Sequence, residues 1–235
     1  MSFKLSGSSY KIEEFFKLGV LAGYGTKELT LGELKNLAEK ENKILISGVQ
    51  THSNNVIVLK KEDKIEKISF EDTDGLITNN ENICLYTKHA DCLSIYFYDK
   101  INKVIGICHS GWKGSFNEIS LNMIKRFKEE FNTKEENLVV AIGIGISCKN
   151  YEVSEEFRKD FIEKFGIDIV EKSFEIKNKK VYFDNTIFNY LLLIKNGINK
   201  GNLYFSNECT YDNKNLHSFR RDKELSGRNL AYIYI

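Results

Sequence analysis

Residues 92–109 read CLSIYFYDKINKVIGICH, and this stretch decides both the fold class and the site that we expect. Two apolar segments rich in β-branched and aromatic residues flank a polar tetrapeptide, which is the pattern of a β-hairpin. A two-residue loop pairs Tyr98 with Lys103, and the same register pairs Cys92 with His109. Directly opposite residues have Cβ atoms ~5 Å apart. The hairpin therefore predicts a thiolate and an imidazole that share a metal ion.

Side chains alternate between the two faces of a strand, so Cys108 points away from the face of His109 and is a poor ligand for the same ion. A single cysteine at a strand end is more often a packed or inert thiol. A lone histidine is usually a structural hydrogen-bonding residue. The cross-strand pairing raises the chance of a site, and other residues do more to decide between these interpretations.

Helix and strand patterns alternate along the rest of the chain, with no linker or repeat. Thr30 and Glu33 form a capping-box pattern, and Ser154 and Asp184 are helix caps. We expect helices over 30–41, 115–131, 154–165 and 185–196, and strands over 44–49, 56–59, 83–87, 93–98, 103–109, 138–146, 202–206 and 229–235. This mixture predicts an α+β (mixed α/β) fold, with mixed sheets packed against helices in one domain over 1–235.

Composition excludes several classes of partner. Basic and acidic residues nearly cancel, to a formal net charge of +1, so no overall field favours nucleic acid or an anionic membrane. No apolar run approaches the ~18 residues of a membrane-spanning helix, and the N-terminus does not resemble an export signal. The five cysteines show no paired spacing and indicate reduced thiols. We expect a cytoplasmic monomer or homodimer that acts on small molecules.

Five strings resemble the successive signature blocks of one family, in family order. That family is called YfiH-like, multicopper polyphenol oxidase (laccase domain) or peptidoglycan editing factor, and its members are regarded as purine nucleoside phosphorylases. The strings are GVQTHSNNVIVL (48–59), DGLITNNENICLYTKHADCLSIYF (74–97), IGICHSGWKGS (105–115), AIGIGISCKNYEV (141–153) and ECTYDNKNLHSFRRDKELSGR (208–228).

The resemblance implies a YfiH-like fold, related to that of a deamidating toxin, and a zinc site. The ligands are the His of the Gln-x-His block, the Cys of Ala-Asp-Cys and the His of His-x-Gly-Trp, which here are His52, Cys92 and His109. Three protein ligands leave an open position, as in catalytic zinc sites. Copper is the alternative ion, because a His2Cys set also resembles a blue-copper site.

The resemblance further implies phosphorolysis of purine nucleosides (adenosine, inosine, guanosine and methylthioadenosine) to the base and ribose 1-phosphate. Adenosine deamination is implied as a second activity. A true multicopper oxidase needs on the order of ten imidazoles, since His is the usual copper ligand. The chain has four, at His52, His89, His109 and His217. We therefore do not expect a conventional laccase.

Candidate phosphate contacts are basic residues within the matching blocks. Lys113 belongs to the loop SGWKGS before the 115–131 helix, whose backbone N–H groups also favour anions. Arg220, Arg221 and Arg228 can add charge-assisted hydrogen bonds. Lys27 replaces an arginine that the family usually carries, as does Lys113.

Other residues have weaker assignments. Trp112 is the only tryptophan and can stack on a base, although a buried core role is an equal alternative. Asp91 is assigned a supporting catalytic role, orienting a ligand or a water, with a structural role as the alternative. Asp74 reads as a turn residue, and His89 as a hydrogen-bonded structural residue.

Three rival functions remain open on the sequence. In a cysteine hydrolase, Cys92 is the nucleophile and His109 the base. In a cell-wall (peptidoglycan) precursor editing enzyme, nucleoside turnover is incidental. A non-catalytic binding protein is the third, and an intact ligand set with an open position counts against it.

Overall fold

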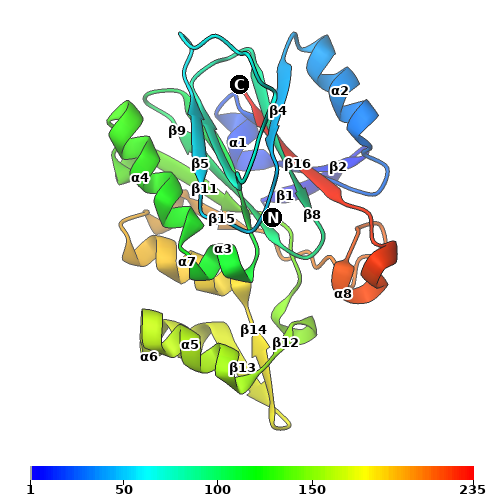
Figure 1. Cartoon of the computed structure of the whole chain (residues 1–235), viewed down its shortest axis with the longest axis vertical. Coiled ribbons are helices and arrows are strands. Elements are labelled where there is room, and N and C mark those ends of the chain that lie inside the picture. The colour runs from blue at the N-terminus through cyan, green and yellow to red at the C-terminus, as the bar shows by residue number, and fades with distance from the viewer. Residues whose placement is uncertain (1) are drawn as a thin grey trace.

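The computed structural model describes residues 2–235, which form two large mixed β-sheets, a small third sheet and surrounding helices (Figure 1). The seven-stranded sheet has the order β1 (Phe3–Ser6), β2 (Ser9–Ile12), β3 (Leu21–Gly25), β16 (Asn229–Tyr234), β8 (Ile83–His89), β4 (Ile44–Gly48) and β6 (Ser69–Phe70). The six-stranded sheet has the order β15 (Leu203–Phe205), β11 (Leu138–Ile142), β9 (Leu93–Asp99), β10 (Val104–Ser110), β7 (Gly75–Thr78) and β5 (Val56–Leu59). The three-stranded sheet has the order β12 (Glu152–Val153), β14 (Lys180–Phe183) and β13 (Phe174–Lys177).

Helices surround the three sheets. They are α1 (Glu13–Lys17), α2 (Leu31–Lys40), α3 (Trp112–Phe116), α4 (Ile119–Phe131), α5 (Glu155–Phe165), α6 (Ile167–Ser173), α7 (Asn185–Lys195) and α8 (Phe219–Asp222). Short 3₁₀ turns span Glu135–Asn137, Cys148–Asn150, Lys200–Asn202 and Lys223–Leu225. Parallel and antiparallel pairs occur in both large sheets, which confirms the predicted α+β (mixed α/β) class. No helix within residues 2–235 is long and apolar enough to cross a bilayer.

The main core lies between the two large sheets, and alternation along β9 shows how it forms. Tyr96 and Tyr98 belong to the cluster shared with the seven-stranded sheet, whereas Ile95 and Phe97 pack with residues of α4 and α7. The ring of Phe97 lies 6.0 Å from that of Phe127 on α4. Each fully buried side chain of this kind contributes about 1.5–3 kcal/mol. The strands of the central hairpin are therefore buried on both faces and firmly held.

The predicted hairpin forms, but its predicted register is wrong by two residues. Asp99 pairs with Val104, which leaves a four-residue loop, and His109 pairs with Ser94 rather than with Cys92. The reason is the Asp99 carboxylate, whose Oδ1 accepts the backbone N–H groups of Ile101 and Asn102 at 2.9 and 3.1 Å and stabilises the longer loop. A shift of two residues preserves the faces of a strand. Cys108 accordingly packs in the core beside α4, away from His109, as predicted.

Several predicted elements have the expected ends. The Thr30–Glu33 capping box is present, and Ser154 and Asp184 accept hydrogen bonds at the first turns of α5 and α7. The predicted 115–131 helix is instead two helices, because Glu118 has a left-handed φ of 61° between α3 and α4. The predicted 138–146 strand ends at Ile142.

Candidate metal centre

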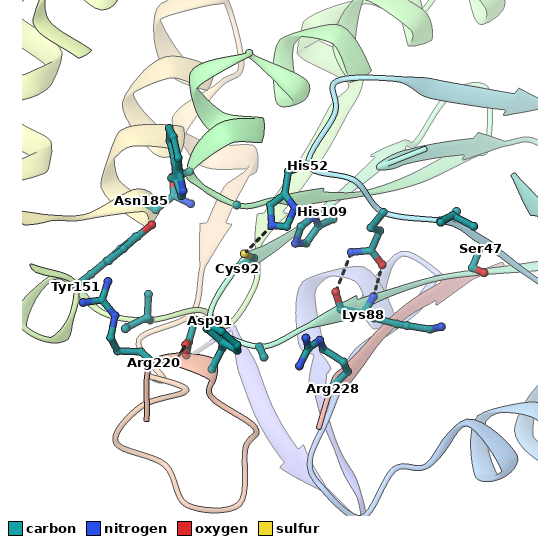
Figure 2. A pocket seen from close by; sticks show the side chains of 18 of the residues that line it. Ser47, His52, Lys88, Asp91, Cys92, His109, Tyr151, Asn185, Arg220 and Arg228 are labelled. Carbon is teal, nitrogen blue, oxygen red and sulfur yellow. Dashed lines mark hydrogen bonds between the residues drawn. The ribbon is translucent and has the colours of Figure 1, made fainter. Parts of the chain in front are cut away.

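Three side chains from separate segments meet in one place, as Figure 2 shows. His52 lies in the loop between β4 and β5, Cys92 in the turn between β8 and β9, and His109 on β10. Their ligand atoms all lie within 4.8 Å of one another, and Nε2 of His52 is 3.9 Å from Sγ of Cys92. The structure therefore brings together the three residues that the sequence nominates as metal ligands.

One buried carboxylate, Asp74, holds two of these ligands. Its Oδ1 lies 2.7 Å from Nδ1 of His109 and accepts the backbone N–H of His52 at 3.1 Å. Its Oδ2 accepts the backbone N–H groups of Thr51 and Ser53 at 2.9 and 3.0 Å. The carboxylate holds a proton on Nδ1 of His109, so a metal would bind at Nε2 in place of a proton. The interpretation of Asp74 as a turn residue missed this role, because it depends on a contact with a distant strand.

Two residues at the site have left-handed backbone conformations: His52, with a φ of 64°, and Asp91, with a φ of 84°. Such conformations cost of order 1–3 kcal/mol outside glycine and persist where neighbouring contacts hold them. Asp74 holds His52. The Asp91 carboxylate accepts the Thr210 hydroxyl at 2.5 Å and the backbone N–H of Arg220 at 2.6 Å. Through these two hydrogen bonds, Asp91 connects the turn that carries Cys92 to the segment around α8.

Gly111 leaves the space in which two ligands approach each other. A Cβ atom at this position would lie 2.8 Å from Cδ2 of His52 and 2.9 Å from Sγ of Cys92. Real Cβ atoms essentially never come this close to another heavy atom. Glycine is therefore required here by packing against the ligands, and its own backbone conformation is ordinary.

Electrostatics at the centre favour a thiolate. Burial raises the pKa of Cys92, but the positive charge of His109 and hydrogen bonds from His109 and His52 outweigh burial and lower that pKa below its ordinary value. Burial lowers the pKa of His109, while the Cys92 thiolate and the Asp74 carboxylate raise it by more. A deprotonated sulfur is the form that binds a metal.

His89 has the structural role that the sequence predicts. It is buried, and its ring nitrogens lie 2.7 Å from the Thr87 hydroxyl and 3.2 Å from the Cys92 carbonyl oxygen. Burial lowers the pKa of His89 well below its ordinary value. The neutral ring supports the turn that carries Cys92 and is not one of the three grouped ligands.

The centre opens into a cavity of about 670 Å³. Four of the predicted supporting residues line it: Asp91, Trp112, Arg220 and Arg228. Sequence reasoning missed other lining residues, among them Gln50, Lys88, Tyr151, Asn185 and Phe219. Of these residues, all but Asn185 stand within the matching blocks, and that position is the one signal by which they could have been found.

Trp112 is not a core residue. Its side chain remains 40% exposed at the cavity, with one edge packed against Phe157 at a ring separation of 5.3 Å. Of the two roles considered for Trp112, the buried one is therefore excluded, and an aromatic face is available at the cavity wall.

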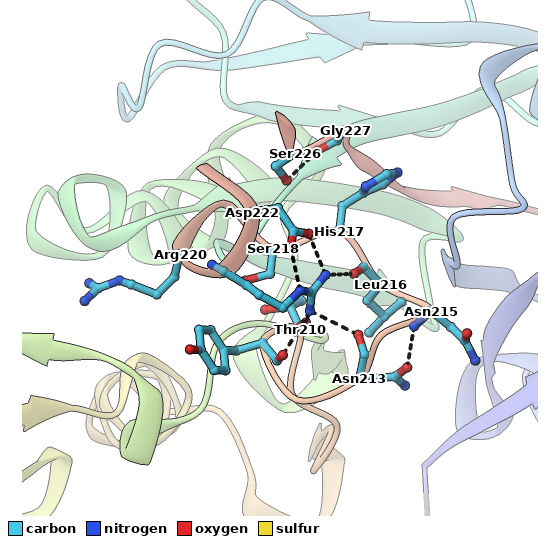
Figure 3. A network of polar contacts seen from close by, with 12 residues as sticks. Thr210, Asn213, Asn215, Leu216, His217, Ser218, Arg220, Asp222, Ser226 and Gly227 are labelled. Atoms are coloured by element: carbon cyan, nitrogen blue, oxygen red, sulfur yellow. Dashed lines mark hydrogen bonds and ion pairs between the residues drawn. The ribbon is translucent and has the colours of Figure 1, made fainter. Parts of the chain in front are cut away.

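Three predicted phosphate contacts do not line the cavity: Lys27, Lys113 and Arg221. Lys113 is exposed and lies over the Trp112 ring. The Arg221 guanidinium pairs with Asp222 and donates to backbone carbonyls, including those of Thr210 at 2.7 Å and Leu216 at 2.6 Å (Figure 3). Arg221 thus organises the loop before α8, and its donors are already used.

The geometry fits a tetrahedral metal ion. Bonds of ~2.0–2.3 Å hold ligand atoms about 3.5 Å apart, close to the 3.9 Å between Nε2 of His52 and Sγ of Cys92. The His109 ring beside Cys92, the favoured thiolate and the space at Gly111 all agree with such an ion. This is the one group of three or more His, Cys, Asp or Glu side chains with metal-ligand spacing within residues 2–235.

Known proteins resemble this chain in sequence. The model of a family described as multi-copper polyphenol oxidoreductase laccase matches residues 31–235. A purine nucleoside phosphorylase of Borreliella burgdorferi is 43% identical over 168 residues, which cover 72% of this chain and 71% of the relative. The purine nucleoside phosphorylase YlmD of Bacillus subtilis is 27% identical over 190 residues, which cover 78% of this chain and 68% of the relative.

Solved structures resemble this chain in fold. The hypothetical protein YfiH of Bacillus licheniformis superposes with a TM-score of 0.88 at 25% identity, covering 99% of this chain and 98% of that one. YlmD of Geobacillus stearothermophilus also has a TM-score of 0.88, with the same coverage and 22% identity, and supports the fold alone. The family match, the 43% identical relative and the shared fold agree with the signature blocks. The chain therefore belongs to the YfiH-like family described as multi-copper polyphenol oxidoreductase laccase.

Proposed function

We propose that this protein is a zinc-dependent purine nucleoside phosphorylase. The observation that carries the proposal is a His2Cys centre opening into a cavity that offers both an aromatic face and cationic side chains. The cavity volume lies in the range of small-molecule sites. The names of the relatives support the reaction class. The substrates would be adenosine, inosine, guanosine or methylthioadenosine with phosphate, and the products the base and ribose 1-phosphate.

His52, Cys92 and His109 would hold the ion. When bound, zinc supplies a Lewis acid with an open coordination position. Other residues of the chain orient these ligands. Asp74 fixes the orientation of His109 and of the loop that carries His52. A preorganised site of this kind avoids reorganisation during the reaction.

Substrate contacts follow from the cavity wall. The exposed face of Trp112 is suited to stack on the purine. Arg220 and Arg228 both line the cavity, and Arg228 supplies positive charge for phosphate. The Asp91 carboxylate accepts the backbone N–H of Arg220 and so keeps Arg220 next to the turn that carries Cys92. We therefore assign Asp91 a positioning role.

We propose adenosine deamination as a second activity of the same centre. The five free cysteines support a reducing compartment, the cytoplasm.

A cysteine hydrolase is the second candidate, because a thiolate beside an imidazole is also a nucleophile–base pair. The two candidates differ in their need for metal. A hydrolase of that type would keep its activity after chelation, whereas the phosphorylase would lose its activity together with the zinc.

The test is to incubate the purified protein with inosine or adenosine, with and without phosphate, and to follow the products by chromatography. We expect phosphate-dependent release of base and ribose 1-phosphate, which disappears in Cys92→Ala. Cys148→Ala is the matched control, because Cys148 is a half-buried thiol outside the cavity lining. Release of free ribose without phosphate, or no turnover of any nucleoside, would reject the proposal.

A further inference from the structure

The cavity has two chemically different ends, one on each side of the metal centre. In Figure 2, Tyr151, Asn185 and Arg220 lie on one side of the His52–Cys92 pair. Lys88, Arg228 and Ser47 lie on the other side. A substrate that fills the cavity therefore has to cross the centre and meets different groups at its two ends.

The end near Tyr151 is aromatic. The rings of Trp112 and Tyr151 both pack onto one phenylalanine cluster: Trp112 is 5.3 Å from Phe157, Phe157 is 5.3 Å from Phe183, and Tyr151 is 5.8 Å from Phe183. These contacts place Trp112 and Tyr151 at the same end. Phe219, 44% exposed, also lines the cavity. Exposed aromatic faces of this kind are platforms for a planar base.

The opposite end is cationic. Lys88 is the one exposed residue of β8, and its ammonium group makes no hydrogen bond or ion pair within residues 2–235. Lys88 pairs with Leu230 on β16, so Arg228, two residues before Leu230, emerges on the same face. The Gln50 side chain accepts the Lys88 N–H at 2.7 Å and donates to the Lys88 carbonyl at 2.8 Å, which fixes the backbone that carries the ammonium.

Charge at the two ends favours an anion at Lys88 and Arg228. Arg220 donates to the Glu152 carbonyl from both terminal nitrogens, at 3.3 Å each, and lies 5.2 Å from the Tyr151 ring. Within residues 2–235, Arg228 donates to the Ser226 and Gly227 carbonyls, at 3.0 and 2.9 Å, from Nη1 alone, so its Nη2 and Nε remain available to an anion. The Asp91 carboxylate, which accepts the Arg220 N–H, would also repel a nearby anion. No carboxylate lines the cavity next to Lys88 and Arg228 among the described residues.

We infer that inorganic phosphate binds between Lys88 and Arg228, while the purine occupies the Trp112–Tyr151 end, so that the ribose spans the metal centre. This inference rests on the proposed phosphorolysis and gives the substrate an orientation. Of the arginines expected to contact phosphate, it retains Arg228 and leaves out Arg220, and it adds Lys88, which the sequence did not suggest.

The orientation suits displacement at the anomeric carbon of the ribose. A phosphate oxygen forms the new C–O bond on the face opposite the purine, as the C–N bond breaks and its electron pair leaves with the purine. The proton of the attacking hydrogen phosphate ends on the purine nitrogen, so atoms and charge balance. Nucleophile and leaving group on opposite sides of the sugar are the geometry that this displacement requires.

Two binding measurements on the zinc-loaded protein test the inference without requiring turnover. Equilibrium dialysis with radiolabelled inorganic phosphate measures the anion site. Because Trp112 is the only tryptophan, quenching of its fluorescence by hypoxanthine measures the base site. We expect Lys88→Gln and Arg228→Gln each to weaken phosphate binding at least about tenfold, or about 1.4 kcal/mol, with base quenching unchanged. Arg220→Gln should spare phosphate binding.

Lys100→Gln is the matched control, since Lys100 is an exposed lysine in the β9–β10 loop. Wild-type phosphate binding in Lys88→Gln, or loss of phosphate binding in Arg220→Gln alone, would overturn the inference. Failure of the phosphorylase proposal has a different signature: phosphate and base bind as expected, but no nucleoside is cleaved. A protein that binds neither ligand overturns both.

Discussion

The Asp74 carboxylate lies 2.7 Å from Nδ1 of His109 and at the same time accepts the backbone N–H of His52 at 3.1 Å. Two ligands that are distant in the sequence therefore share one buried anchor. Asp74 is 1% exposed and precedes β7, which pairs with β10, the strand that carries His109. The position of the metal centre is consequently set by the pairing of these two strands.

Asp74→Asn is expected to weaken zinc binding about 10–100-fold. An amide in this place presents an NH2 group to backbone N–H donors and no longer carries the charge that orients His109. Competition with a chelator of known affinity measures the change. Circular dichroism should show the fold retained.

Asp72→Asn is the matched control. Asp72 also holds the loop before β5, since it accepts a hydrogen bond from Nδ2 of Asn55 at 2.7 Å, but it does not contact His109. A small effect on zinc affinity is expected. Equal losses in the two variants would mean that the loop, and not the Asp74–His109 contact, determines metal affinity.

Gly111→Ala is expected to remove zinc while leaving the fold intact. The added methyl group would stand 2.8 Å from His52 and 2.9 Å from the Cys92 sulfur, so these flexible ligands must move apart. Metal analysis should find the site largely empty, with far-UV circular dichroism like that of the wild type. Gly32→Ala, in the exposed first turn of α2, is the control, because its nearest neighbour is 3.8 Å away and alanine favours helix. Full zinc occupancy in Gly111→Ala would contradict the proposed arrangement of ligands.

The sequence predicts the ligand set better than it predicts the geometry. His52, Cys92 and His109 stand in blocks whose order and spacing are specific, and alternation correctly puts Cys108 on the other face of β10. The pairing of Cys92 with His109 was wrong, because a side-chain contact made by Asp99 lengthens the loop. Hairpin register depends on such local hydrogen bonds, which apolar periodicity does not report.

Other features arise only from tertiary contacts. The sequence indicated no strands before residue 44, yet β1, β2 and β3 form one edge of the seven-stranded sheet, in which β3 pairs with the C-terminal strand β16. The roles of Asp74 and Lys88 likewise depend on partners far along the chain. Arg221 stands in the last matching block beside Arg220, and its structural role is visible only from the loop carbonyls around it.

Arg221→Ala is therefore expected to cost stability rather than substrate affinity. Its removal leaves the partly buried carbonyls of Thr210 and Leu216 without their donors and breaks the pair with Asp222. A loss of about 2 kcal/mol in the free energy of unfolding follows. Urea denaturation measures the loss. Arg158→Ala should lose much less, because within residues 2–235 the Arg158 guanidinium bonds only to Glu155. A stable Arg221→Ala protein that no longer binds phosphate would show that Arg221 is a ligand after all.

The central hairpin provides the last prediction. Asp99 is fully buried, and its carboxylate accepts hydrogen bonds from two backbone N–H groups of the loop, from Nδ2 of Asn102 at 2.8 Å and from the Thr133 hydroxyl at 2.6 Å. Asp99→Ala leaves these donors unpaired and should lower the free energy of unfolding by about 3 kcal/mol. Lys100→Ala, in the same loop but exposed, should change it by less than about 0.5 kcal/mol. Because the pairing of β10 with β7 also holds the strand that carries His109, the folded Asp99→Ala protein should still bind one zinc ion. Loss of zinc from a folded Asp99→Ala protein would instead mean that the loop sets the register on which the metal centre depends.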